Sequence, residues 1–129
     1  MKREAIQTDN APKALGPYSQ AIRHGSMLFV SGQLGLHPVT SHLASDDIES
    51  QVNQALSNVE AICLQAGTSI QHALKLTLYL QDLSDFAAVN RVIEANLTAP
   101  YPARATTQVA GRPLSALIEI DAIVAIHAG

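Results

Sequence analysis

The sequence predicts an α+β sandwich, in which one mixed sheet of about six strands carries two helices on one of its faces. Two observations support this prediction. Two stretches repeat apolar residues at helical spacing, and several others alternate apolar and polar residues as strands do. The expected order is two or three strands, a long helix, a strand, a second helix and two strands. With 129 residues, 47% of them hydrophobic, the chain has the size of a single domain over residues 1–129.

A hairpin is predicted near the start of the chain. Its strands lie near Ser19–Arg23 and Met27–Ser31, and they flank a turn at residues 24–26 (HGS). The long helix follows from Ile48, where apolar residues recur in steps of three and four as far as position 66. Asp46 followed three residues later by Glu49 predicts a capping box at its start, and Gly67 predicts its end.

The second half of the chain predicts a strand, a helix and two more strands. The helix runs from about Leu83 to Asn96, with an apolar face, and Pro100 and Pro102 prevent it from continuing. Alternation predicts the strands His72–Leu80, Ala103–Ala110 and Leu117–His127.

These strands predict two sheet faces of different character. Leucines and isoleucines point toward the helices. The other face is expected to carry Lys75, Thr77, Tyr79, Arg104, Thr106 and Glu119, together with apolar members such as Ile123. Because no third helix is available to cover this mixed face, we expect other subunits to close it.

Composition excludes several classes of function. The formal charge is −3, the basic residues are scattered and only 4% of residues are aromatic, which argues against a nucleic-acid partner. No apolar run approaches the ~18 residues of a membrane span, and residues 1–11 contain no signal-peptide core. The single cysteine, Cys63, rules out an intrachain disulfide, so a reducing, cytoplasmic location is expected.

Four stretches together resemble the RidA/YjgF family of reactive intermediate deaminases. They are residues 14–21 (ALGPYSQA), residues 29–34 (FVSGQL) with Gln51 and Asn58 further on, residues 75–90, and residues 101–105 (YPARA) followed by 117–122 (LIEIDA). They span about residues 12 to 126 in the family's order. Each motif is weak alone, but the combination is highly specific.

This resemblance implies a chorismate-mutase-like fold and a homotrimer with ligand clefts between its subunits. It also implies hydrolysis of 2-aminoacrylate or 2-aminocrotonate, through their 2-imino acid tautomers, to 2-keto acids and ammonia. No cofactor and no metal are implied. The five histidines show no ligand spacing either.

The chemistry assigns roles to three residues at positions that match the family's site. Arg104 has a planar guanidinium that can bind both oxygens of a substrate carboxylate. Glu119 can orient a water against the imine carbon and take part in proton transfer. Tyr18 can hydrogen-bond or cover the substrate. The alternatives are a surface ion pair for Arg104, an ion pair with Lys75 for Glu119, and a packing anchor for Tyr18.

Four further residues match positions that line or support the family's cleft: Ser31, Gly32, Asn90 and Thr106. Ser31 and Gly32 are alternatively a strand end, and Asn90 a surface residue. At position 106 the family commonly has a cysteine, so thiol-dependent behaviour is not expected here. The segment 94–102 is also shorter than usual and lacks the family's aromatic pair, which bears on substrate range. Cys63 is one of the apolar residues that recur at helical spacing along the long helix, and it is expected in the core.

Three other functions remain open alternatives. The first is a trimer of the same fold that binds small acids without turnover, as a sensor or regulator. The presence of Glu119 beside Arg104 argues for turnover, because binding alone needs only the arginine. The second is a nuclease or translation inhibitor, which the acidic balance disfavours. The third is a chaperone-like role, on which the sequence is silent.

Overall fold

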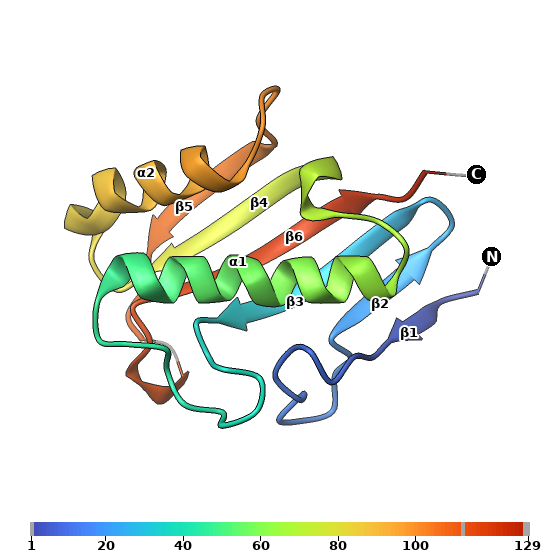
Figure 1. The fold of residues 1–129 in the computed structure, drawn as a ribbon, viewed down its shortest axis with the longest axis horizontal. Helices are drawn as coiled ribbons and strands as arrows, with labels where there is room; N and C mark the ends of the chain where they lie inside the picture. Colours follow the sequence, from blue (N-terminus) through green and yellow to red (C-terminus); the bar gives the residue numbers. More distant parts are fainter. Residues whose placement is uncertain (1, 112, 128–129) are drawn as a thin grey trace.

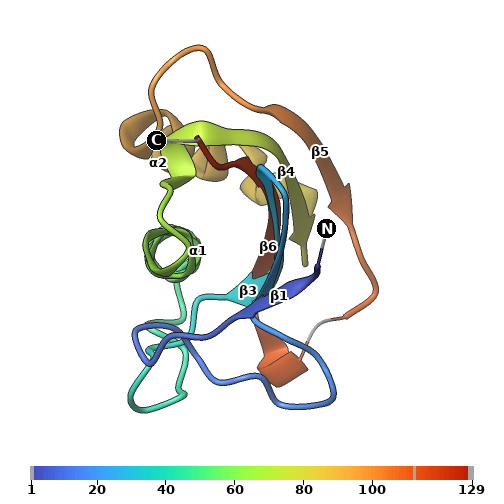
Figure 2. The same cartoon turned by 90° about the vertical axis from the view of Figure 1, so that its right-hand side faces the viewer.

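The fold is one six-stranded sheet with both helices on the same face (Figures 1 and 2). The computed structural model describes residues 2–111 and 113–127, so the predicted domain 1–129 includes four positions outside the described residues. The elements are β1 (Glu4–Ile6), β2 (Ala21–His24), β3 (Met27–Leu34), α1 (Ile48–Gln65), β4 (Ala73–Leu80), α2 (Phe86–Asn96), β5 (Ala103–Gln108) and β6 (Ile118–Ala125), with short 3₁₀ turns at Ile70–His72, Leu83–Asp85 and Pro113–Ser115.

The sheet is mixed, as predicted. Its strand order is β1-β2-β3-β6-β4-β5. Among the described strands, β4 and β5 are the one parallel pair, and α2 makes the crossover between them, since parallel neighbours need a long connection. The other pairings are antiparallel. The predicted hairpin joins β2 and β3, and Gly25 adopts a positive φ of 62° in its turn.

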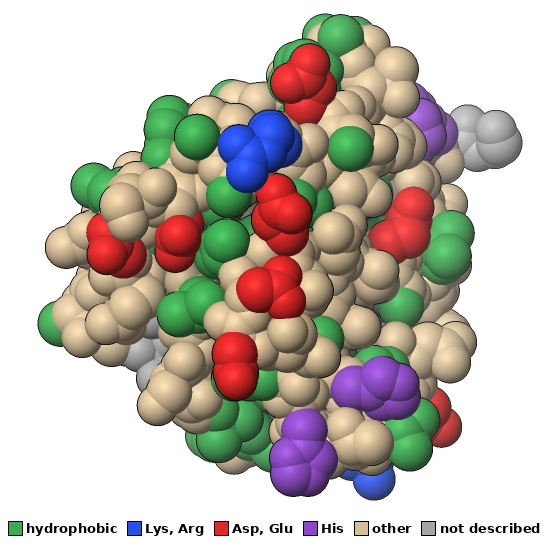
Figure 3. All heavy atoms as spheres, turned by 60° about the vertical axis from the view of Figure 1, so that its left-hand side comes forward, with side chains coloured by type: hydrophobic (Ala, Val, Ile, Leu, Met, Phe, Trp, Pro, Cys, Tyr) green, Lys and Arg blue, Asp and Glu red, His purple; other side chains and the backbone are tan. Residues whose placement is uncertain are grey.

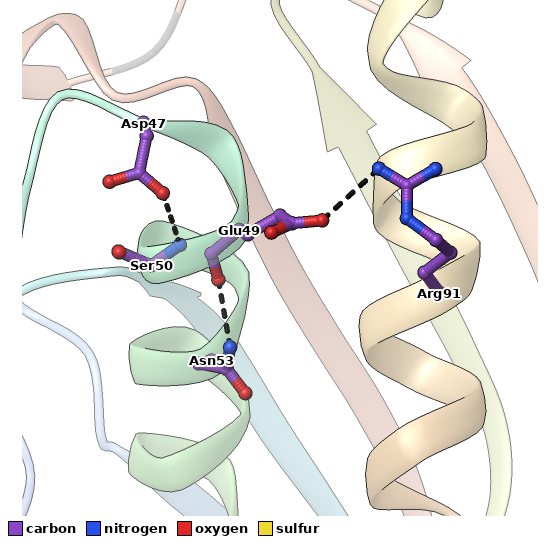
Figure 4. A network of polar contacts seen from close by, with 5 residues as sticks. All are labelled: Asp47, Glu49, Ser50, Asn53 and Arg91. Atoms are coloured by element: carbon purple, nitrogen blue, oxygen red, sulfur yellow. Dashed lines mark hydrogen bonds and ion pairs between the residues drawn. The ribbon is translucent and has the colours of Figure 1, made fainter.

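The long helix α1 begins where it was expected, but its cap differs from the prediction. Asp47, not Asp46, is the N-cap, and its Oδ2 accepts a hydrogen bond from the backbone N of Ser50 at 2.9 Å. Glu49 makes no capping box. It forms an ion pair with Arg91 of α2 at 3.1 Å, which ties the two helices together (Figure 4). Gly67, with φ of 82°, follows the helix end as predicted.

The core lies between the helices and the sheet. Leu76, Leu78 and Leu80 of β4 are fully buried, as the alternation predicted. Leu74 is the exception, with 48% of its surface exposed. The pairing of β4 with β6 shifts between Ala73 and Lys75, and this irregularity breaks the alternation at Leu74. Cys63 is buried as predicted, and burial, followed by the charge of Glu60, raises the pKa of its thiol to about 12.

The expected membership of the polar face was wrong for two residues. In the parallel pairing of β4 with β5, Arg104 lies opposite Leu76 and Thr106 lies opposite Leu78. Directly paired residues point to the same face of a sheet, so both side chains lie on the helix side. Glu119 pairs with Tyr79 and therefore points to the other face. The two-residue spacing shows that Arg104 and Thr106 share one face of β5. The register between β4 and β5 decides which face of the sheet that is.

The face opposite the helices is uncovered within the described residues (Figure 2). Lys75, Thr77, Tyr79, Glu119 and Ile123 lie on it, as predicted. It also carries large apolar side chains that are partly exposed, namely Met27 at 36% and Phe29 at 43%. Among the described residues, no helix is long and apolar enough to cross a membrane.

Candidate active site

The residues predicted to form one site fall into two clusters on opposite faces of the sheet. Tyr18, Ser31, Gly32 and Glu119 line one cavity of about 430 Å³. Asn90 and Arg104 line another, of about 440 Å³, between α2 and β5. A larger cavity of about 520 Å³ beside α1 contains none of the predicted site residues.

The first cavity is built on an irregularity in β3. The pairing of β3 with β6 shifts between Val30 and Gln33, so Ser31 and Gly32 together face one residue of β6 in a bulge with one extra residue, and they are not a strand end. The hydroxyl of Ser31 donates to the carbonyl of Ser19 at 2.6 Å. This bond ties the bulge to the loop that carries Tyr18, and the hydroxyl acts here as a support.

Glu119 lies directly over Gly32. A Cβ at position 32 would lie 2.8 Å from Cδ of Glu119 and closer still to its Oε2. Glycine is therefore the residue type that admits this carboxylate between β3 and β6. The alternative ion pair with Lys75 is not favoured, because Lys75 lies opposite Ile123, four residues along β6, or about 13 Å of strand away.

Tyr18 lies at the edge of this cavity. Its side chain is 51% exposed, so it is not a buried packing anchor. Its hydroxyl accepts a hydrogen bond from the backbone N of Leu15 at 3.2 Å, which closes the 15–18 loop on itself. The cavity wall near it is largely apolar, with contributions from Leu15, Leu34 and Leu36. The polar groups of the lining are the Glu119 carboxylate, the Tyr18 phenol, the Lys13 side chain and the side chains of Gln20, Ser31 and Gln33. A small ligand would therefore meet both a carboxylate and a lysine in a mostly apolar setting.

Negative charge concentrates beside this cavity on the uncovered face. The Tyr79 hydroxyl donates to Oδ2 of Asp121 at 2.9 Å. This hydrogen bond, then burial, then the charges of Asp121 and Glu119 raise the pKa of Tyr79. Tyr79 therefore stays a neutral donor and holds Asp121 in place next to Glu119.

Three buried amides fix the backbone around the cavity. Gln20 accepts from the backbone N of Thr8 at 2.8 Å and donates to the carbonyl of Pro12 at 2.9 Å, so it holds the approach to the Tyr18 loop. Gln51 accepts from the backbone N of Leu117 at 2.8 Å, two residues before Glu119. Asn58 donates to the carbonyls of Leu34 and Leu36, at 3.1 and 2.9 Å. Their role was not predicted, although all three belong to stretches that resemble the family: Gln20 to residues 14–21, and Gln51 and Asn58 to the second stretch.

The second cavity holds Arg104. Its guanidinium carbon lies 5.3 Å from the centre of the Phe86 ring, in a cation–π contact with the start of α2. Across residues 2–111 and 113–127 no carboxylate lies within ion-pair distance of Arg104, so the surface ion pair is not formed there. Asn90 and Tyr101 line the same cavity. Phe86 lies in the helix that was predicted from about Leu83 to Asn96, and it is 42% exposed.

Thr106 lies two residues beyond Arg104 on the same face. Its Oγ1 is buried and has no hydrogen-bond partner among the described residues. Buried hydroxyls normally find a partner, and this one would have to become accessible before a bound molecule could supply it.

Among the described residues, no group of three or more histidine, cysteine or acidic side chains is placed to hold a metal ion. Fold and site together define a small α+β domain that places a carboxylate and a phenol in one cavity and a guanidinium in another.

Comparison with known proteins shows which family the chain belongs to. The family model described as Endoribonuclease L-PSP matches residues 8–126. The solved structure of RidA from the Antarctic bacterium Psychrobacter sp. PAMC 21119 superposes with a TM-score of 0.93 at 47% identity, covering 96% of this chain and 100% of that one. E. coli TdcF, solved with bound serine, superposes with a TM-score of 0.90 at 38% identity, covering 96% and 99%.

The 2-iminobutanoate/2-iminopropanoate deaminase of Salmonella typhimurium is 43% identical over 123 residues, which cover 93% of this chain and 95% of that protein. Other relatives carry only the name RutC family protein. The chain belongs to the RidA/YjgF family.

Proposed function

We propose that this protein hydrolyses small 2-imino acids, the tautomers of 2-aminoacrylate and 2-aminocrotonate, to 2-keto acids and ammonia. The observation that carries the proposal is the Glu119 carboxylate held over Gly32, beside Tyr18, in a largely apolar cavity. The name of the Salmonella relative supports the same reaction.

The proposed chemistry needs a water, a base and an anchor for the substrate carboxylate. Glu119 orients the water and accepts a proton as the water oxygen bonds to the imine carbon. As the C–O bond forms, the second C=N bond opens onto the nitrogen, which takes that proton and becomes the amino group of a carbinolamine. Glu119 then takes the proton of the new hydroxyl and passes it to the amino group, so that the C=O bond forms as the C–N bond breaks, releasing a 2-keto acid and ammonia. Arg104 binds the carboxylate through its two parallel N–H groups, and the Thr106 hydroxyl, buried in this structure, offers one further hydrogen bond once it becomes accessible. No covalent intermediate is needed, so a threonine at position 106 is compatible with turnover.

The same proposal requires more than one subunit. Arg104 and Glu119 point to opposite faces of one sheet and cannot reach the same small molecule within a chain. We propose a homotrimer of about 41 kDa, three times the 13.7 kDa chain, that closes the uncovered face and joins Glu119 of one subunit with Arg104 of its neighbour.

A subunit-mixing experiment tests this site. A dehydratase that uses pyridoxal phosphate generates the enamine, and 2-keto acid formation is measured. Arg104→Ala and Glu119→Ala should each be inactive alone. When equal amounts are refolded together, about a quarter of randomly formed interfaces should pair an intact Arg104 with an intact Glu119 and regain activity. No recovery in trimers shown by mass to be mixed would disprove the intersubunit site.

Binding without turnover is the rival proposal. It predicts that the wild-type protein binds pyruvate but adds nothing to the uncatalysed rate of enamine breakdown. A ribonuclease is named in the description of the family model. The face shown in Figure 3 gathers acidic side chains and only scattered basic ones, and this face would repel an RNA backbone.

A further inference from the structure

Two histidines meet where β4 begins and β6 ends, away from both proposed half-sites. Nδ1 of His72 lies 3.2 Å from Nε2 of His127, with the ring centroids 4.4 Å apart and the ring planes at 85°. We propose that this pair is a binding site for a divalent transition-metal ion of the Zn²⁺, Ni²⁺ and Cu²⁺ class. The proposal is independent of the deaminase function.

The separation of the two nitrogens matches that of two ligands on one ion. Zinc–imidazole bonds of about 2.0–2.1 Å at a tetrahedral angle place two ligand nitrogens about 3.3 Å apart. In the metal-free pair the two nitrogens share a hydrogen bond. To bind an ion, the two rings must turn out of their edge-to-face arrangement so that both lone pairs converge on one point, a change open to exposed imidazoles with a broad χ2.

Both ligands sit on backbone that the fold holds in place. The backbone N of His72 donates to the carbonyl of Ser69 at 2.9 Å, which closes a 3₁₀ turn. Ile126, next to His127, is buried, and its backbone N donates to the carbonyl of Ser26 at 2.8 Å. The ordering cost of binding is therefore reduced, because the backbones of the two ligands are already positioned.

The surroundings select the class of ion. A cavity of about 500 Å³ opens beside the pair, and amide, hydroxyl and apolar groups of the described residues line it together with the two imidazoles. None of the described residues that line it carries a carboxylate, which disfavours Mg²⁺ and Ca²⁺, since these ions need oxygen ligands. Imidazole suits Zn²⁺, Ni²⁺ and Cu²⁺. Water molecules in the cavity would complete the coordination.

Sequence spacing gives no sign of this pair. The two histidines are 55 residues apart, and the register of β4 with β6, which sets Ala73 opposite Val124, brings them together. The expectation that the histidines show no ligand spacing holds only along the chain.

Calorimetric titration of the untagged, chelator-treated protein with ZnCl₂ or NiCl₂ tests the proposal. We expect one ion per chain. His72→Gln and His127→Gln should each weaken binding by about tenfold or more, since even outer-shell partners of metal ligands are worth that much. Circular dichroism verifies that the variants are folded. The control, His37→Gln with His42→Gln, changes two exposed histidines of another loop and should leave the affinity unchanged.

Imidazole ¹⁵N spectra provide the second readout. On addition of a sub-stoichiometric amount of Zn²⁺, the resonances of His72 and His127 should shift and the other three should not. Wild-type affinity no higher than that of the double His72/His127 variant would overturn the proposal. An equal loss of affinity in the control variant would overturn it as well.

Discussion

Gly32→Ala is the sharpest test of the geometry proposed for catalysis. The added Cβ would lie 2.8 Å from Cδ of Glu119. Carbon atoms in contact lie about 3.5–4.0 Å apart, so the carboxyl carbon must retreat by about 0.7 Å or more. Because the clash involves the far end of a flexible side chain, the fold can absorb it while the carboxylate moves.

The expected result is a loss of turnover with little loss of stability. A misplacement of about 1 Å in a catalytic group can cost about 100-fold in rate, and we expect a fall of that order in kcat. Pyruvate binding by calorimetry should change little, because Arg104 supplies the anchor. The rate is measured in the enamine-coupled assay and the stability by urea unfolding.

Gly111→Ala is the matched control, because a Cβ there meets nothing within 4 Å. It should keep wild-type turnover. If Gly32→Ala also keeps wild-type turnover while Glu119→Ala is inactive, the position of the carboxylate over Gly32 is not the catalytic one. If Gly32→Ala and Glu119→Ala both keep full activity, Glu119 has no part in the mechanism.

Four other predictions follow from the structure. Arg104→Ala should weaken pyruvate binding roughly ten- to a hundredfold, and Arg104→Lys should restore it only in part, as measured by calorimetry. Thr106→Cys should preserve or raise deaminase activity; loss of activity would assign the hydroxyl a specific role. Hydrogen bonds from Ser45 and then from Ser50 lower the pKa of Asp47 to about 2. The ionised carboxylate therefore contributes fully to stability above its ordinary pKa of 3.8, and this contribution is lost as pH falls through about 2. In Asp47→Ala, the free energy of unfolding measured in urea should differ less between pH 5 and pH 2 than it does in the wild type. Light scattering should give about 41 kDa, and a stable monomer at micromolar concentration would refute the trimer.

The sequence predicted most of the fold because its periodicities are local. Helical spacing from Ile48 and the stop at Gly67 follow from side chains and backbone preferences within one element. The cap was assigned to Asp46 instead of Asp47, because neighbouring acidic residues are equally good caps and only backbone geometry chooses between them. Leu74 departed from its pattern because the irregularity in β4 depends on pairing with β6.

The candidate site was predicted as a set of residues but not as an arrangement. Motif matches singled out Tyr18, Gly32, Glu119 and Arg104, and the structure gathers the first three around one cavity. The separation of Arg104 from this group escaped prediction, since a spacing of two residues shows which side chains share a face but not which face it is. The support from Phe86 escaped prediction for a similar reason, because its partner lies on another element.

By itself, the sequence determined the class of fold, the two helices, the strands other than β1 (Glu4–Ile6) and the residue types available for chemistry, because hydrophobic period and turn chemistry act over a few residues. Only the tertiary structure decided that Glu119 lies over Gly32, that Arg104 faces the helices and that His72 meets His127. Each of these depends on the register between strands that are distant in sequence. That register is set by the packing of the whole sheet, and a shift of one residue would reverse every face.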